Sequence, residues 1–201
     1  MAAARHAASH VGDASAAAAV HDNELVSRAA TGDRAAWGTL VDRYLGPISG
    51  YAWYMLGDRG EAEDVAQETF VRLMGKVVAW DADGEASLKT WLYRVAINLC
   101  IDRRRKVVPL LVAELPEVPD AHAAGAELRL DRERALREAL DRLPERQRAV
   151  LTLVYYQGFT NGEAAVALRI SVEAVESLLA RARRALRTLL MPVRDDLLGR
   201  T

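Results

Sequence analysis

Apolar residues recur at helical spacing along most of the chain, and no segment alternates apolar and polar residues as a half-buried strand does. The most informative segment is residues 88–106, LKTWLYRVAINLCIDRRRK. The apolar residues that share one helical face there are Leu88, Trp91, Leu92, Val95, Ala96 and Leu99. Ser87 stands just before them as an N-cap residue. The pattern predicts a helix here and an all-α fold for the chain.

The opposite side of this helix carries Tyr93, Ile97 and Cys100 and is therefore not simply polar. A helix that is apolar on two sides is packed on both, or is packed on one and offers the other to a partner. The helix ends in the basic run RRRK at residues 103–106. Two interpretations of this end stay open: cations that complement the dipole of a core helix, or basic groups presented to nucleic acid.

The helices expected before this one cover residues 22–32, 33–46, 47–56 and 61–77, with glycine and proline at their boundaries. In the last of them Asp64, Glu68 and Val71 stand opposite the apolar face, with Gln67 beside them. A polar stripe of this kind is most often a solvated face. Between residues 79 and 87 the sequence predicts a short acidic loop with an exposed Trp80.

The second half of the chain is again helical, after a proline-containing stretch at residues 107–126 without periodicity. The helices expected there cover residues 127–143, 145–157, 161–168 and 172–190, and the last two with their short turn form a helix-turn-helix pattern. We therefore expect two small helical domains, 22–106 and 127–192, joined by the flexible linker 107–126, with tails at 1–21 and 193–201. The basic outer face of the last helix is equally expected of an ordinary helical bundle.

The charge and the cysteine content exclude few classes of protein. The formal net charge of −1 gives no indication for or against nucleic acid, although residues 127–201 carry a net +3. The single cysteine, Cys100, excludes an internal disulfide and fits a reducing cytosol. Metal-ligand spacing, a transmembrane run and a signal peptide are not found in the sequence. We therefore expect a cytoplasmic protein without a cofactor, a bound metal or membrane insertion.

Three motifs in order resemble those of bacterial extracytoplasmic-function (ECF) sigma factors, of the sigma-70 superfamily. Residues 61–70, EAEDVAQETF, closely resemble the family signature DAEDVAQETF. Residues 90–105, TWLYRVAINLCIDRRR, are similar to the promoter-melting segment of the family. Residues 143–186, which begin LPERQRAVLTLVYYQGFT, are similar to its second conserved domain. The resemblance covers about residues 22–190.

The resemblance implies a protein that is not an enzyme, that binds core RNA polymerase and that directs it to promoters. The residues that it places against core polymerase are Asp64, Gln67 and Glu68. Those that it places along melted promoter DNA are Arg94, Asn98, Asp102, Arg103 and Arg104, with the loop from Trp80 shaping a pocket for a flipped base. Residues 172–184 would lie in the major groove of the more distant promoter element. The candidate contacts, at the start and on the outward side of that helix in this sequence, are Ser171, Glu173, Ser177, Arg181 and Arg184. An anti-sigma protein is the expected regulator.

The recognition helix departs from the pattern S-x-GTVKSR that the family commonly has. Glu173 and Ala174 replace Gly and Thr, Glu176 replaces Lys, and Leu178 replaces Arg. Phosphate binding there is expected to be weaker, or the DNA sequence recognised to be different. We expect Glu173 to accept a hydrogen bond from a cytosine amino group and Glu176 to face the DNA backbone, although either acid could simply complement the helix dipole.

Two other classes of protein remain as alternatives. A plain helix-turn-helix repressor would bind DNA without polymerase, but it leaves the motif at residues 61–70 unexplained. A sigma-like decoy would bind a regulatory protein and no promoter, which the acidic recognition helix allows. Tyr93, Ile97 and Cys100, with the apolar start VVPLLV of the linker, suggest surfaces that need cover. We expect an anti-sigma protein to clamp between the two domains and hide them.

Overall fold

The computed structural model describes residues 21–81, 84, 86–107 and 134–191 of the chain, and within these ranges it contains helices and no strand. The named elements are α2 (Arg34–Leu56), α3 (Arg59–Lys76), the 3₁₀ helix η1 (Val77–Ala79), α4 (Leu88–Val107), α6 (Glu145–Tyr156), α7 (Asn161–Leu168) and α8 (Val172–Leu190). Residues 21–30 and 134–141 are also helical. The all-α prediction is confirmed. The predicted linker and tails lie almost entirely outside the described residues.

The prediction of separate helices at 33–46 and 47–56 is wrong, because α2 is one helix of 23 residues with Pro47 inside it. An interior proline costs about 3 kcal/mol, because it removes a hydrogen bond and crowds the preceding turn. Pro47 and Gly46 lie on the exposed side. The buried side continues past them without a break, through Ala36, Leu40, Tyr44, Ile48, Tyr51, Ala52 and Met55. Burial of this continuous face therefore outweighs the local cost of Pro47.

Several other helix ends are defined by side-chain caps and by a left-handed glycine. Asp33 accepts hydrogen bonds from the backbone N–H groups of Ala35 and Ala36 at the start of α2. Gly57 ends α2 with φ 78°, in the left-handed region that glycine adopts without strain. Thr160 and Glu163 form a capping box at the start of α7. These ends fix the lengths of the helices and so the faces that each presents.

The α7–turn–α8 unit has the predicted helix-turn-helix form. α7 ends at Arg169, whose φ of 54° is the one positive value at a non-glycine residue among those described. Ser171 then begins α8, its Oγ accepting a hydrogen bond from Ala174 N at 3.2 Å. Val175, Leu179 and Ala182 are the buried residues of α8 and lie on one side of the helix.

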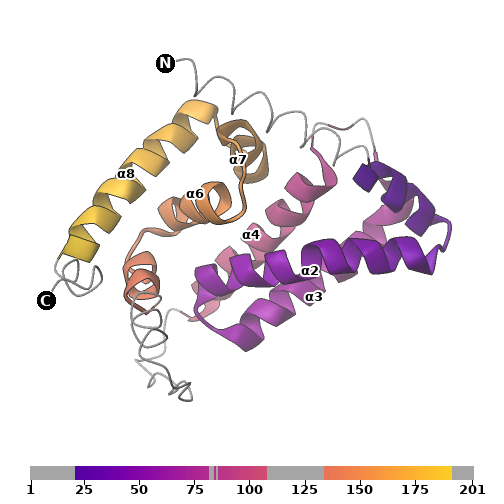
Figure 1. Cartoon of the computed structure of the whole chain (residues 1–201), viewed down its shortest axis with the longest axis horizontal. Helices are drawn as coiled ribbons and strands as arrows, with labels where there is room; N and C mark the ends of the chain where they lie inside the picture. The colour runs from indigo at the N-terminus through magenta and orange to yellow at the C-terminus, as the bar shows by residue number, and fades with distance from the viewer. Residues whose placement is uncertain (1–20, 82–83, 85, 108–133, 192–201) are drawn as a thin grey trace, which may run out of the picture.

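The helix α4 is packed on both of its apolar sides. Leu92 and Ala96 are buried on one side, and Tyr93, Ile97 and Cys100 on the other. The hydrophobic core of α2, α3 and α4 continues without interruption into residues of α6, α7 and α8. Figure 1 shows α4 lying between the α2–α3 pair and the orange helices α6 and α7. The chain itself therefore covers the second apolar side of α4 that the sequence left open.

Candidate protein and nucleic-acid interfaces

The outer face of α3 carries the predicted polymerase-facing residues. Asp64 and Gln67 are exposed, and both lie opposite the buried residues of the helix. Glu68 is partly exposed and forms an i,i+4 ion pair with Arg72, with 3.0 Å between Glu68 Oε1 and Arg72 Nε. All three residues are therefore reachable from solvent, on one stripe of one helix.

An apolar strip that the sequence reasoning did not recognise continues this face. Val71, Met74 and Val78 are 58%, 63% and 81% exposed, which are high values for large apolar side chains. Their spacing of three and four residues prolongs the stripe of Asp64 and Gln67 along α3 and into η1. Extending that periodicity past Val71 would have found Met74 and Val78. A face that mixes acidic and exposed apolar side chains is suited to a protein partner.

The predicted melted-DNA residues of α4 divide into two groups. Arg94 and Asn98 line a cavity of about 180 Å³ between α4 and the C-terminal helices. Arg94 donates a hydrogen bond from Nη2 to the carbonyl oxygen of Val166 in α7, at 2.9 Å. Asn98 and Asp102 are exposed, one turn apart. Arg105 is exposed as well and was not predicted, although its place one turn beyond Asp102 could have indicated it.

The other group, Arg103 and Arg104, is engaged within the protein. Arg103 donates to the carbonyl oxygen of Glu61 at 2.7 Å, and its Nε lies 3.3 Å from Glu61 Oε2. Arg104 donates to the carbonyl oxygen of Met55 at 2.7 Å. These contacts tie the end of α4 to the start of α3 and to the end of α2.

Trp80 is half-buried rather than exposed as the sequence suggested. Its indole N–H donates to Asn23 Oδ1 at 3.1 Å. Its ring packs edge-on against Trp91 of α4, with 6.0 Å between the ring centroids. Trp80, at the start of the acidic loop, is thereby held beside the first turns of α4.

The candidate DNA-contacting residues of α8 lie on its outer side. Glu173 is exposed, and hydrogen bonds from its own backbone N–H and from the Ser171 hydroxyl lower the pKa of its carboxyl group. Ser177 Oγ accepts a hydrogen bond from Arg181 Nη2 at 2.8 Å. Arg181 and Arg184 are exposed. The first turn of the helix is therefore acidic and the following turns are basic.

Arg148 in α6 is a buried charged residue that sequence reasoning did not single out. Its side chain is fully buried, and its Nη1 donates to Asp141 Oδ1 at 2.6 Å and to the carbonyl oxygen of Met55 at 3.0 Å. Burial and the neighbouring Arg104 lower the pKa of its guanidinium, while Asp141 opposes this shift. Nothing in the local sequence distinguishes Arg148 from a solvated helix residue, because its partners come from other elements.

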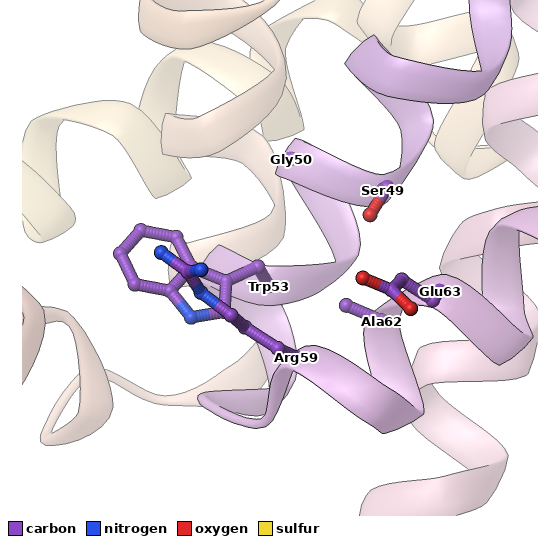
Figure 2. A pocket seen from close by; sticks show the side chains of 6 residues that line it. All are labelled: Ser49, Gly50, Trp53, Arg59, Ala62 and Glu63. Carbon is purple, nitrogen blue, oxygen red and sulfur yellow. The ribbon is translucent and has the colours of Figure 1, made fainter. Parts of the chain in front are cut away.

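A further hollow lies between α2 and the start of α3, and none of the predicted residues lines it. Its volume is about 260 Å³, and its lining is Ser49, Gly50, Trp53, Arg59, Ala62 and Glu63. Figure 2 shows the Arg59 side chain extending toward Trp53 on one side, with Ser49 and Glu63 on the other. Among the described residues no cluster of His, Cys, Asp and Glu could hold a metal ion. In the same part of the chain no helix is long and apolar enough to cross a membrane.

Comparison with known proteins gives the same two regions. The family model Sigma-70 region 2 matches residues 40–108, and the model Sigma-70, region 4 matches residues 133–186. The chain is 33% identical over 175 residues to the ECF RNA polymerase sigma factor SigW of Bacillus subtilis, covering 78% of this chain and 89% of that protein. It is 32% identical to the RNA polymerase sigma-H factor of Pseudomonas aeruginosa, covering 86% and 95%. The solved structure of CnrH in complex with the cytosolic domain of CnrY aligns with a TM-score of 0.66 and 30% identity, covering 84% of this chain and 96% of that one.

Proposed function

The chain belongs to the ECF family of sigma-70 factors, and from this membership we propose that it binds core RNA polymerase and directs it to promoters. Sigma factors are specificity factors for transcription initiation and not enzymes. The observation that supports the proposal is the solvent-exposed stripe of α3, which leaves Asp64, Gln67 and Glu68 of the motif at residues 61–70 reachable from solvent.

The proposed polymerase surface consists of Asp64, Gln67 and Glu68, extended by Met74 and Val78. The carboxylates would meet basic groups of the polymerase, which favours encounter and fixes the orientation of docking. The exposed methionine and valine would supply apolar area to the contact. This apolar area is exposed in the free chain, and its removal from water in the complex would favour binding.

The proposed surface for melted DNA runs along α4 through Arg94, Asn98, Asp102 and Arg105. The Watson–Crick edge of a base becomes accessible only after the base leaves the duplex, and the amide and cationic groups of a single helix can then serve as contacts. Arg103 and Arg104, which the family resemblance also assigns to DNA, hold the end of α4 in place in this structure. In the proposal, Arg103 and Arg104 therefore orient the exposed residues beside them.

The proposed reader of the distant promoter element is α8. Its N-terminal end would enter the major groove with Ser171, Glu173 and Ser177, while Arg181 and Arg184 would contact phosphates. The hydrogen bonds that Glu173 accepts from its own helix end support the capping alternative for this residue. A base contact by Glu173 would need the carboxylate to exchange those bonds for a cytosine amino group.

An inhibitory protein partner is also part of the proposal. CnrH, at 30% identity, was solved in complex with the cytosolic domain of CnrY. We expect an anti-sigma protein to bind this chain too. A partner that inserts between the two domains would have to displace the contacts that α4 makes with α6 and α7.

Run-off transcription tests the proposal most simply. Purified chain and core polymerase are incubated with a library of promoter fragments, and the transcript starts are sequenced. We expect transcripts that share a two-part upstream sequence and that depend on the chain. Core binding without any transcript would favour the decoy alternative. Sequence-specific binding to duplex DNA by the chain alone, with no polymerase bound, would favour a plain helix-turn-helix repressor.

A further inference from the structure

The hollow between α2 and the start of α3 is lined by none of the residues assigned above to polymerase or to DNA. The residues with small or no side chains that line it are Ser49, Gly50 and Ala62. A Cβ atom added at Gly50 would meet no heavy atom within 4 Å, so the space beside the α2 backbone is open there. The volume of about 260 Å³ lies near the lower end of the range for small-ligand pockets, about 300–1,000 Å³. The hollow therefore suits a ligand with one compact ring system.

Trp53 gives this hollow an aromatic wall that is held in place by its neighbours. The indole ring is half-buried. The guanidinium carbon of Arg137 lies 5.3 Å from its centroid, and Tyr54 packs at its edge with 5.0 Å between the ring centroids. Planar bases stack on aromatic side chains of this kind, and a ring that is already held loses little freedom when a ligand binds. The wall therefore favours a planar aromatic ligand.

Two opposite charges complete the lining without pairing with each other. Arg59 and Glu63 are exposed and stand four residues apart on α3, a spacing at which opposite charges on a helix can form an ion pair. Figure 2 shows Arg59 extending instead toward Trp53, with Glu63 and Ser49 on the other side. Among the described residues, no ion pair or side-chain hydrogen bond engages Ser49, Arg59 or Glu63. Their polar groups are therefore available to a ligand that needs both a cation and a carboxylate.

The chemistry of this lining matches a guanine nucleotide better than the other common nucleotides. Guanine has two adjacent N–H donors on one edge, the ring N1–H and the 2-amino group, and a carboxylate can accept from both at once. Adenine and cytosine place an acceptor nitrogen beside their amino group, and that nitrogen would face a carboxylate oxygen unfavourably. A phosphate group is the natural partner of a guanidinium. The two charges of the hollow thus correspond to the two ends of such a nucleotide.

We propose that this hollow is a binding site for a free guanine nucleotide. The base stacks on Trp53 and donates hydrogen bonds to the carboxylate of Glu63, while the phosphate binds the guanidinium of Arg59. The inference goes beyond the proposed function and does not depend on it, because the hollow shares no residue with the proposed polymerase and DNA surfaces.

The test is an NMR titration of the full-length chain that follows the indole N–H resonance of Trp53. The chain has four tryptophans, and Trp53→Phe identifies the resonance by its loss. GMP should shift this resonance with half-saturation below about 1 mM, whereas AMP and CMP should need concentrations at least about tenfold higher. IMP lacks the 2-amino group and keeps one of the two donors, so its affinity should lie between those of GMP and AMP. This comparison uses the wild-type chain and needs no folded variant.

Two substitutions separate the contribution of the base from that of the phosphate. Glu63→Ala should reduce the preference for GMP over AMP to less than about twofold, because the acceptor for the guanine edge is lost. The wild type should bind GMP about tenfold more tightly than guanosine, and Arg59→Ala should remove this difference. Arg34→Ala and Glu24→Ala are the matched controls and should behave as the wild type. Both are exposed, and Arg34 begins α2 as Arg59 begins α3.

Three results would each overturn the inference: no shift of the Trp53 resonance by GMP, equal affinities of the wild type for GMP and AMP, or unchanged selectivity in Glu63→Ala. A short oligothymidine that carries one guanine distinguishes a free nucleotide from a guanine within a strand. It should bind no more tightly than GMP. Tighter binding of the oligonucleotide would overturn the assignment to a free nucleotide.

Discussion

The outer faces of α3 and α4 belong to the same small bundle, yet they differ in what surrounds them. The α3 face is open to solvent, and its acidic and apolar residues are available to a partner. The corresponding face of α4 lies against α6 and α7, with Arg94 bonded to Val166 and Tyr93 bonded to Gln157. One helix of this bundle therefore leaves its outer face to solvent, while the next helix packs its second apolar side against the rest of the chain and keeps Asn98, Asp102 and Arg105 exposed.

The largest effect is expected from reversing charge on α3. The double substitution Asp64→Lys and Glu68→Lys should abolish binding to core polymerase, because like charge in an interface costs several kcal/mol. Far-ultraviolet circular dichroism should stay unchanged, since exposed charge swaps usually cost little stability. The matched control is Glu24→Lys with Asp42→Lys, the same change in charge at exposed sites on other helices. If core polymerase retained the α3 variant as well as it retains the wild type in a pull-down, the proposed polymerase surface would be wrong.

The apolar strip should give a smaller loss. Met74→Gln with Val78→Thr should weaken core binding roughly ten- to hundredfold, the range expected when two apolar side chains no longer contribute to a contact. Val166→Thr with Met191→Gln makes similar changes at exposed positions of the second domain and should leave core binding alone. A titration with fluorescent polymerase would measure both. Equal losses in the two pairs would mean that the strip has no special role.

The α3 surface was partly predictable from the sequence, and the reason is local. Asp64, Gln67 and Glu68 stand out because one amphipathic helix buries its opposite side, so periodicity alone separates exposed from buried positions. Trp80 was misjudged because its partners, Asn23 and Trp91, belong to other helices, and folding brings them beside it. A local pattern contains no information on such contacts.

For α4, the sequence predicted that the helix has two apolar sides, but not what packs against the second one. The sequence indicated that Tyr93, Ile97 and Cys100 needed cover, but it could not say that the chain itself supplies it. Periodicity likewise gave no reason to single out Arg148, whose role depends on Met55 and other groups brought close by folding. The same limit explains α2: the sequence showed the local cost of a proline, while the gain from a continuous buried face is a tertiary effect.

The α4 residues should separate into DNA-contacting and structural groups. Asn98→Ala with Arg105→Ala should leave thermal stability and core binding unchanged and reduce open-complex formation, with the salt slope falling by about 0.7 for each lost phosphate contact. Arg103→Ala with Arg104→Ala should lower the melting temperature by a few degrees, since each lost hydrogen bond costs about 1 kcal/mol. Permanganate footprinting of the holoenzymes and thermal scans would compare them. Normal melting of DNA by the first pair would refute its assignment.

The smallest effect is expected at the recognition helix. Glu176→Lys should strengthen binding to all promoters by a few-fold and steepen the salt slope by roughly one contact, if Glu176 faces the DNA backbone. A base-reading role would instead weaken binding to the native promoter by about 1–3 kcal/mol while other sequences gain. Titrations of wild-type and variant holoenzyme on native and scrambled elements at two salt concentrations distinguish these results. Selective loss on the native promoter would reverse the assignment.

The contrast between an open α3 and a covered α4 is tested most directly by hydroxyl-radical footprinting of the free and the core-bound chain. Met74 is exposed in the free chain, whereas Tyr93 and Phe159 are almost fully buried. On binding core polymerase and a promoter, Met74 should become protected, while Tyr93 and Phe159 should become more readily oxidised as α4 separates from the C-terminal helices. Unchanged oxidation of Met74, or continued protection of Tyr93 and Phe159 in a complex that has melted its promoter, would contradict the account.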